Sequence, residues 1–317
     1  MTSTADLIIE RRRMRRRLAL WRILAVVAAF GAIVVGIASV ADLSKITGGG
    51  DPTEAHIARI KIDGVIFSDR DRAKEIKEIA EDKNAKALIV EINSPGGTVT
   101  GSEELYDGLR DVAEAKPVVA IMREAAASGG YITAIAADHV LASGNSITGS
   151  IGVVFEAPNI APLLEDIGVD VMRLKSSPLK AEPGFLTPPA EGALAARQVL
   201  LEDTFLWFKG LVGQRRQISE PQLTELSDGR IFTGRMALGA GLIDAIGNED
   251  TAREWLEAER GLSSELEIED RDWRKPQGSV LARLLNDAGE SLGLPLPAWR
   301  DARPRLGAGP VLMAIMY

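Results

Sequence analysis

A chain of 317 residues, 46% of them hydrophobic, has room for one large domain or two small ones with a sizeable core. Residues 1–22 hold seven arginines against Asp6 and Glu10, and since the net charge of the chain is −8, the remaining residues carry −13. This acidic balance argues against a nucleic-acid partner. The absence of cysteine excludes disulfides, thiolate metal sites and a cysteine nucleophile.

The N-terminal segment predicts a membrane anchor. Arg11–Arg13 and Arg15–Arg17 precede the uncharged, apolar stretch Ile23–Ala41, whose 19 residues would form a helix of about 28 Å, close to the roughly 30 Å hydrocarbon core of a bilayer. The cationic side holds the N-terminus in the cytoplasm, so everything after Asp42 is expected outside it. A cleaved signal peptide is the alternative, although its apolar region usually has only about 7 to 15 residues.

Composition then divides the chain into five parts. These are a basic segment (1–22), the anchor (23–41), a flexible linker containing Gly48–Pro52 (42–54), one compact domain (55–275) and a tail of open role (276–317). In the compact domain, strand-like runs at 57–66, 87–92, 117–122, 140–142 and 169–174 alternate with helical patterns at 72–81, 100–115, 128–137 and 190–212. We place the N-cap of the second helix at Thr100, with Glu103 completing a capping box. This alternation predicts an α/β fold with a mainly parallel sheet.

Ser128 is the first candidate for chemistry. It stands between small residues, Ala125–Ala127 and Gly129-Gly130, directly after an apolar strand. If the strand ends there and a helix begins, the Ser128 hydroxyl would lie exposed at the helix N-terminus. The amides of Gly129 and Gly130 could then face an oxyanion. The sequence therefore predicts a nucleophile.

The loop Asn93–Gly97 follows another buried strand. Pro95 lacks an amide hydrogen and Gly96-Gly97 allows torsions closed to other residues, so the loop can present a main-chain amide to a ligand. An ordinary tight turn is the alternative. Ser128 lies 31 residues after Gly97, one helix and one strand later, so adjacent parallel strands would bring both loops to one sheet edge.

The base that activates Ser128 is harder to find. His56 precedes the first strand and His139 follows the helix that Ser128 begins, so neither is well placed. A lysine can serve if burial lowers its pKa from about 10.4 toward 7 or 8. Lys175 and Lys180 flank a segment with few acidic residues before Glu182, and the residues alone do not choose between them.

Taken together, the motifs resemble those of the signal peptide peptidase A (SppA) family of membrane-bound Ser-Lys proteases. The resemblance covers roughly residues 55–250 and rests on Asn93–Gly97, Ala127–Tyr131, Thr148–Val153, Lys175–Lys180, and Asp228–Gly234 with Gly241–Asp244. It implies a ClpP/crotonase-like α/β fold of repeated β-β-α units. The chain departs from the family pattern after the Lys-Ser pair. A glycine is common there in the family, whereas this chain has Ser177-Pro178.

The resemblance also implies the site residues. Ser128 would be the nucleophile and Lys180 the general base, and Ser150 would orient the lysine unless it is only a turn residue. Gly97 and Gly129 would form the oxyanion hole, and Gly96 would bind the substrate main chain. No cofactor or metal ion is expected.

The family pattern further implies a homo-oligomer, an octamer, in which serine and lysine meet across a subunit boundary. Its substrates would be peptides, chiefly signal peptide remnants, cleaved outside the cytoplasmic membrane of a bacterial-type cell, on the periplasmic side.

Three alternatives remain: a crotonase-like acyl-CoA enzyme, a noncatalytic membrane scaffold, and a related protease acting on regulatory membrane proteins. The apolar C-terminal segment Gly309–Tyr317 suggests a product-like plug for a peptide groove, against a packed strand, a membrane contact or disorder.

Overall fold

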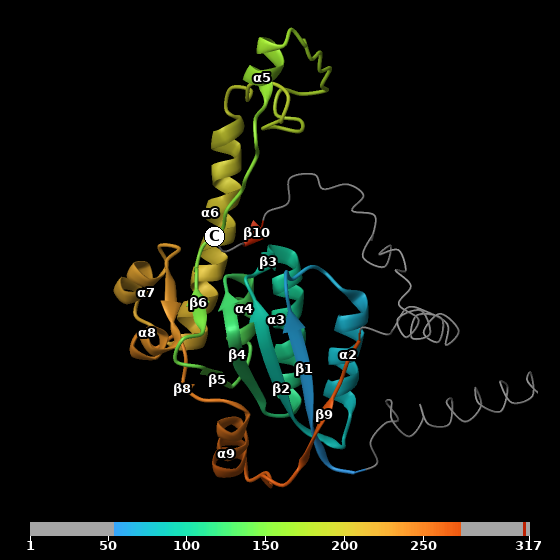
Figure 1. Ribbon diagram of the computed structural model, residues 1–317, viewed down its shortest axis with the longest axis vertical. Helices are drawn as coiled ribbons and strands as arrows, with labels where there is room; N and C mark the ends of the chain where they lie inside the picture. The colour runs from blue at the N-terminus through green and yellow to red at the C-terminus, as the bar shows by residue number, and fades with distance from the viewer. Residues whose placement is uncertain (1–53, 274–312, 315–317) are drawn as a thin grey trace, which may run out of the picture. The chain divides into compact units, whose positions relative to one another are not determined.

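The computed structural model describes residues 54–273 and 313–314 (Figure 1). A compact unit begins at Glu54, and residues 1–53 form a separate unit. The expected basic segment, anchor and most of the linker and tail lie outside the described residues, so these domain boundaries stay predictions. Among the residues described, no helix is both long enough and apolar enough to span a bilayer.

The strands are β1 (His56–Asp63), β2 (Ala85–Ser94), β3 (Gly97–Thr98), β4 (Val118–Ala127), β5 (His139–Ala142), β6 (Ile147–Gly149), β7 (Ile231–Thr233), β8 (Ala245–Ile246), β9 (Glu267–Asp270) and β10 (Met313–Ala314). The helices are α2 (Arg70–Glu81), α3 (Val99–Ala115), α4 (Gly129–Ala134), α5 (Ala161–Asp166), α6 (Ala193–Arg216), α7 (Glu220–Leu226), α8 (Gly234–Gly239) and α9 (Glu249–Arg260).

The fold is mixed α/β with a mostly parallel sheet, as predicted. Its strands follow the order β7-β6-β4-β2-β1-β9, and β5 joins the amino-terminal half of β4 and carries β8. All pairings in this sheet are parallel except that of β6 with β7. Because β4 pairs with β5 at its amino end and with β6 at its carboxyl end, the carboxyl end of β4 is held between β2 and β6.

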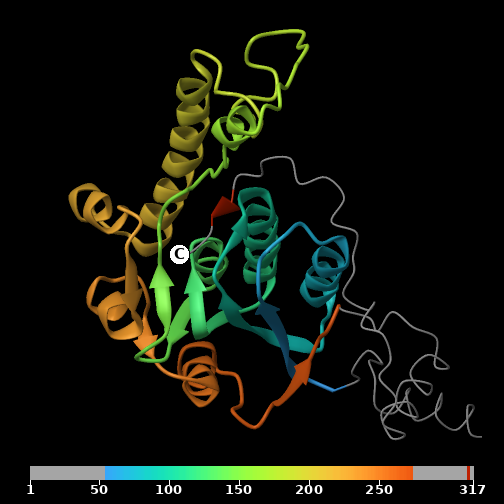
Figure 2. The ribbon, with the colours of Figure 1, turned by 45° about the horizontal axis from the view of Figure 1, so that its top comes forward.

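Apolar side chains cover both faces of the central strands. On β2, Leu88 and Val90 belong to the larger core that includes α2, α3 and α4, whereas Ala87 and Ile89 pack with Ala252 of α9. Figure 2 shows these helices on opposite sides of the sheet. A strand buried on both faces reads as a continuous apolar run, which is why the sequence predicted β2 and β4 well.

Two helix boundaries differ from prediction. The N-cap of α3 is Thr98, whose Oγ1 accepts a hydrogen bond from the Gly101 amide at 3.1 Å, so the predicted cap at Thr100 is wrong. Thr98 is the N-cap because it ends β3 in an extended conformation directly before the first helical turn. The helix after Ser128 ends at Ala134 rather than near Ala137.

The strand predicted over residues 169–174 is also wrong. The segment has no strand structure, and Met172 and Leu174 are 85% and 93% exposed. Its alternating apolar pattern has no partner strand among the described residues, and a strand without a ladder leaves its main-chain groups unpaired.

Tyr131 fixes α4 to the segment that follows α8. Its ring is fully buried, and its hydroxyl donates a hydrogen bond of 2.8 Å to the Leu242 carbonyl oxygen. Burial raises the pKa of Tyr131, which keeps the hydroxyl protonated and able to donate.

We expect Tyr131→Phe to lower the free energy of unfolding by about 1–2 kcal/mol, because the Leu242 carbonyl loses its partner inside the core. Urea denaturation of the full chain measures this change. Tyr106→Phe is the matched control, since the Tyr106 hydroxyl makes no hydrogen bond to a described residue, and we expect about 0.5 kcal/mol or less. Equal losses in both variants would contradict this role of Tyr131.

Candidate functional site

Ser128 lies at a one-residue turn between β4 and α4. It is 1% exposed and has φ 53° and ψ −116°, a region that favours glycine and costs a residue with a side chain on the order of 1–3 kcal/mol. A strained strand-to-helix turn of this kind presents a side-chain oxygen at the end of a sheet.

The Ser128 hydroxyl is not used by the fold. Although Ser128 is the N-cap of α4, its side chain accepts no capping hydrogen bond, and its buried Oγ has no partner among the described residues. A buried hydroxyl without a partner is uncommon and calls for an explanation. Reaction with a bound ligand supplies one.

The loop at the end of β2 lies against this turn. A Cβ atom added to Gly129 would stand 3.2 Å from the Gly97 nitrogen and 2.2 Å from Ser102 Oγ, so the main chains approach closely. Gly130 is equally confined, since its Cβ would stand 2.8 Å from the Ser94 carbonyl oxygen. The structure therefore brings Gly97 and Gly129 together beside Ser128.

Hydrogen bonds to Ile66 orient the Gly97 amide. The Ile66 amide donates to Gly96 O at 2.9 Å, and the Thr98 amide donates to Ile66 O at 2.8 Å. Because successive residues of a strand direct their polar groups to opposite edges, the N–H and C=O of Gly97 face away from Ile66. A Cβ at Gly97 would stand 1.9 Å from Ile66 O, so this position admits only glycine.

Gly96 completes the loop. Its φ of 115° is one that glycine adopts readily, and its amide donates to Ser94 Oγ at 3.1 Å. The two interpretations of the loop Asn93–Gly97, a tight turn and a source of a ligand-facing amide, are thus compatible. The turn itself directs the main-chain amide of Gly97 away from Ile66.

Ser150 lies beside the Ser128 turn. The Ser128 amide donates to Gly149 O at 2.9 Å, and Gly149 pairs with Ala127 across the β4–β6 ladder. Ser150 follows with φ 50°, and its amide donates to Arg230 O at 2.8 Å. Ser150, a second serine with positive φ, therefore lies one residue after Gly149, whose carbonyl oxygen accepts the hydrogen bond from the Ser128 amide.

The structure separates the two candidate lysines. Lys175 Nζ donates to Glu182 Oε1 at 2.6 Å and to Pro178 O at 2.8 Å, so a carboxylate and a carbonyl oxygen already engage this amine. The Lys180 side chain is exposed and makes no ion pair or hydrogen bond with the described residues. Within one chain, Lys180 does not reach the Ser128 hydroxyl.

Glu182, which the sequence reading did not single out, anchors the segment that carries Lys180. Its side chain, which is 2% exposed, also lies 3.4 Å from Arg173 Nη1 and accepts from the Ala190 amide at 3.3 Å. Its carbonyl oxygen accepts from Arg197 Nε of α6 at 3.1 Å. The hydrogen bond from Lys175, above all, holds the pKa of Glu182 below its usual range. The anchoring is therefore present at neutral pH and lost as the pH falls through that lowered value.

Lys180 belongs to a segment that we call the arm, residues 158–206. Figure 1 shows α5 at the end of α6 that lies farther from the sheet. Large apolar side chains of the arm are exposed, namely Ile160, Leu163, Ile167, Val169, Met172, Leu174, Leu179, Phe185, Leu186, Leu194, Val199, Leu200 and Leu206. An exposed apolar surface of this extent is typical of an interaction site.

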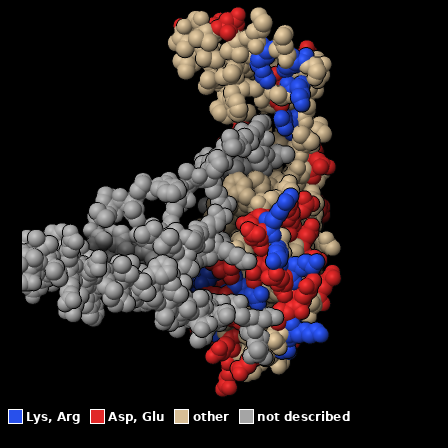
Figure 3. All heavy atoms as spheres, turned by 90° about the vertical axis from the view of Figure 1, so that its right-hand side faces the viewer, with Lys and Arg blue, Asp and Glu red and all other residues tan. Residues whose placement is uncertain are grey.

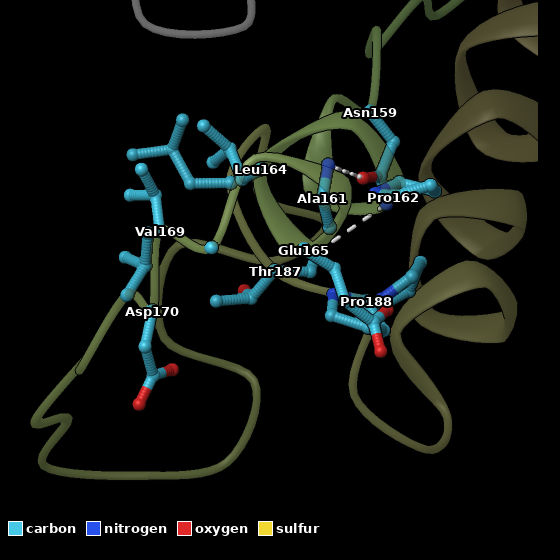
Figure 4. A pocket seen from close by; sticks show the side chains of 13 residues that line it. Asn159, Ala161, Pro162, Leu164, Glu165, Val169, Asp170, Thr187 and Pro188 are labelled. Carbon is cyan, nitrogen blue, oxygen red and sulfur yellow. Dashed lines mark hydrogen bonds between the residues drawn. The ribbon is translucent and has the colours of Figure 1, made fainter.

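The arm also contains a pocket of about 630 Å³ (Figure 4). Its wall is formed by α5 with residues 168–171 and 186–189. Asn159 Oδ1 accepts from the Ala161 amide at 2.8 Å and thereby fixes the start of α5 on one side of it. Leu164 and Val169 stand at its opposite side in the same view.

The histidines do not lie at the site. His56 begins β1, where its Nε2 faces Asp82 and Glu269 at 3.7 Å, and His139 begins β5, where it stacks on Trp255. Both are at the amino ends of their strands, whereas Ser128 follows a carboxyl end. Residues 54–273 and 313–314 contain no group of three His, Asp or Glu side chains that could hold a metal ion.

We expect Glu182→Gln to loosen the segment around Lys180, because a neutral amide loses the charge-assisted bonds from Lys175 and Arg173, worth about 1.5–3 kcal/mol. Trypsin at neutral pH should then cleave after Arg173, Lys175 or Lys180 about tenfold faster. Glu191→Gln is the control, since Glu191 is exposed and forms no ion pair with the described residues. Equal cleavage rates in the two variants would remove the anchoring role.

Comparison with known proteins identifies the family. The model of peptidase family S49 matches residues 110–263. "Putative protease slr0021" of Synechocystis sp. is 40% identical over 215 residues, which are 66% of this chain and 76% of that protein. "Putative signal peptide peptidase SppA" of Enterococcus faecium is 33% identical over 196 residues, 62% of this chain and 57% of that protein.

Among solved structures, a mutant of the 1510-N membrane-bound stomatin-specific protease covers 70% of this chain and 99% of its own, with 15% identity and a TM-score of 0.44. The sequence relatives are much closer, and the match to the Synechocystis protein extends over most of both chains. On these grounds the chain belongs to peptidase family S49, a family of serine-type peptidases.

Proposed function

We propose that this chain is a membrane-anchored serine endopeptidase in which Ser128 is the nucleophile and Lys180 of a neighbouring copy is the general base. The observation that carries the proposal is the buried, unpartnered Ser128 hydroxyl at a strained turn beside the outward-facing Gly97 amide. Its fold would be ClpP/crotonase-like, with the anchor at residues 23–41 and the catalytic domain on the periplasmic side of the membrane.

The reaction follows from these positions. The neutral Lys180 amine accepts the Ser128 proton, and Ser128 Oγ attacks the peptide carbonyl carbon. The Gly97 and Gly129 amides stabilise the oxyanion. The lysine ammonium then protonates the leaving amine, the peptide bond breaks, and water, deprotonated by the same lysine, hydrolyses the acyl-enzyme.

Assembly supplies the missing base. Among the described residues, Ser128 Oγ has no lysine partner, while the Lys180 segment is held firmly by Glu182 on an arm whose apolar side chains are exposed. Contact of each arm with the next copy would bury these side chains, and a head-to-tail contact that closes on itself forms a ring, here an octamer. Burial against the neighbour also favours the neutral amine that the mechanism requires.

Ser150 would orient the lysine. It stands next to Gly149, which holds the Ser128 amide, so an amine that reaches Ser128 Oγ also comes within range of the Ser150 side chain. A hydroxyl at this place can accept a hydrogen bond from the ammonium and hold it toward Ser128.

Substrates would be remnant signal peptides and other small or unfolded peptides. A peptide main chain could bind as an added strand at the edge of β3 that β10 occupies in this structure. Figure 3 shows that the visible face of the arm is mainly uncharged apart from a group of Lys and Arg, whereas Asp and Glu crowd the part of the chain below it. The uncharged part of this face fits apolar peptides.

We expect Ser128→Ala and Lys180→Ala each to lower kcat/KM for a fluorogenic peptide by at least about 1000-fold, because each removes one member of the reacting pair. Mixing the two inactive chains under dissociating conditions and reassembling them should restore about a quarter of the sites, since each restored site needs an intact serine from one copy and an intact lysine from the next. Activity in either single variant would contradict the pair, and no recovery on mixing would contradict its sharing between copies.

The variant Lys175→Ala distinguishes the role of Lys175 from that of Lys180. It leaves Ser128 and Lys180 in place and removes only an anchoring contact to Glu182, so we expect a loss of about tenfold, comparable to that of one charge-assisted hydrogen bond. If Lys175→Ala abolishes activity and Lys180→Ala does not, the assignment of the base is wrong.

We expect Leu174→Asp to weaken assembly and activity together, because burying a charge in place of a leucine removes about 1.5–3 kcal/mol of apolar contact and adds a desolvation cost. The protein concentration at half dissociation, measured by light scattering in detergent, should rise at least about tenfold. Met236→Asp is the control, since Met236 is 55% exposed on α8, outside the arm. Identical size and activity of the two variants would remove the arm from the interface.

A further inference from the structure

The segment before β7 lies against the main chain that holds the Ser128 turn. The Ser150 amide donates to the Arg230 carbonyl oxygen at 2.8 Å. The next residue, Ile231, pairs with Gly149, whose carbonyl oxygen accepts from the Ser128 amide. The position of Arg230 therefore determines where the main chain of residues 149–150 lies beside the serine.

Asp228 binds Arg230 through both its main chain and its side chain. Asp228 Oδ1 accepts from the Arg230 amide at 3.0 Å, and the two carboxylate oxygens accept from Arg230 Nε and Nη2 at 2.6 to 2.9 Å. The hydrogen bonds from the Arg230 side chain, above all, hold the pKa of Asp228 below its usual range, so the carboxylate is ionised at neutral pH. One carboxylate thus fixes Arg230 at two points.

The Asp228 carboxylate also ends the ladder between β6 and β7. In a hydrogen-bonded antiparallel pair, the two residues exchange both main-chain hydrogen bonds. Ser150 and Arg230 make one of them, but the Arg230 amide, which would make the other, donates to Asp228. Ser150 can therefore leave the sheet with φ 50°, a conformation that persists in a residue with a side chain only where neighbouring contacts impose it.

The neighbours of Asp228 along the chain have other roles. Ser227 is buried, and its hydroxyl has no hydrogen-bond partner among the described residues. Gly229 has φ 86°, which permits the short reversal that brings the Arg230 amide back to Asp228. Within this loop, the contact that holds the Arg230 main chain is thus the one with the Asp228 carboxylate.

We propose that Asp228 is a positioning residue of the peptidase site. By binding both the amide and the guanidinium of Arg230, it fixes the carbonyl oxygen that holds Ser150, and Ser150 in turn directs the lysine of the neighbouring copy toward Ser128. Asp228 acts through Ser150 rather than on the substrate. This inference rests on the proposed function and deepens it, because it names the contact that keeps Ser150 in place.

The first test measures kcat and KM for a fluorogenic peptide in the assembled full chain and three variants. Asp228→Ala removes the carboxylate that binds Arg230, and we expect kcat to fall about tenfold, the effect of one charge-assisted hydrogen bond, with KM within about twofold. Asp228→Asn keeps an oxygen that can accept from the Arg230 amide, so it should lose only about threefold. Ser227→Ala, the matched control in the same loop, should keep the original values. Equal kcat in Asp228→Ala and Ser227→Ala would overturn the proposal.

A double substitution separates positioning from a general loss of folded protein. In Ser150→Ala, the hydroxyl through which Asp228 acts is already gone, so adding Asp228→Ala should lower kcat by less than about twofold further. A general weakening of the fold would instead lower kcat about tenfold in either background. Additive losses would therefore refute the path through Ser150.

Hydrogen exchange tests the geometry without turnover. The Ser150 amide should exchange about tenfold faster in Asp228→Ala than in the full chain or in Ser227→Ala, because its acceptor, the Arg230 carbonyl oxygen, is no longer held. Mass spectrometry of a peptide that covers residues 148–153 measures this rate. Unchanged exchange in Asp228→Ala would overturn the proposal, whatever the activity. Full activity of Ser150→Ala would instead contradict the role of Ser150 in the proposed function, and with it the last step of this inference, so the two failures are distinguishable.

Discussion

The hydrogen bond from the Ser128 amide to the Gly149 carbonyl oxygen sets the geometry on which the rest of the site depends. It continues the β4–β6 ladder one residue beyond Ala127, so the chain remains bound to the sheet until the position where α4 must begin. A reversal within one residue requires the positive φ that Ser128 adopts. The carbonyl of Ser128 then accepts from Tyr131 and Ile132, which leaves the hydroxyl as the one polar group of this residue without a partner among the described residues.

Close packing around that turn explains why so few side chains surround it. Gly97, Gly129 and Gly130 each lie so near another segment that a Cβ would collide with it, and two of these neighbours are main-chain oxygens. Main-chain oxygens cannot move aside as a flexible side chain can. The same glycines let α4, β2 and β3 approach one another at the Ser128 turn. The strain at Ser128 and the lack of bulky neighbours thus have one structural origin.

The sequence predicted those parts of the fold whose pattern has a local cause. Strands β2 and β4 are apolar because both faces are buried, and the two loops at their ends were expected at one sheet edge. The segment 169–174 was misread because exposed apolar residues on the arm produce the same alternation as a half-buried strand. Glu182 and the pairing of β10 with β3 depend on contacts between residues that no periodicity relates, so the sequence could not predict them. The ion pair of Lys175 with Glu182 is another such contact.

The proposed sharing of the site between two copies has a thermodynamic rationale. An amine that acts as a base at neutral pH must be desolvated, at a cost of about 3–5 kcal/mol. On an exposed arm that cost is absent, and it arises only when a neighbouring copy covers the segment. Full burial of two or three apolar side chains such as Met172 and Leu174 contributes roughly 3–9 kcal/mol, enough to offset it. Assembly would therefore create the base and the complete site in the same step, and an isolated chain would keep its nucleophile without the means to activate it.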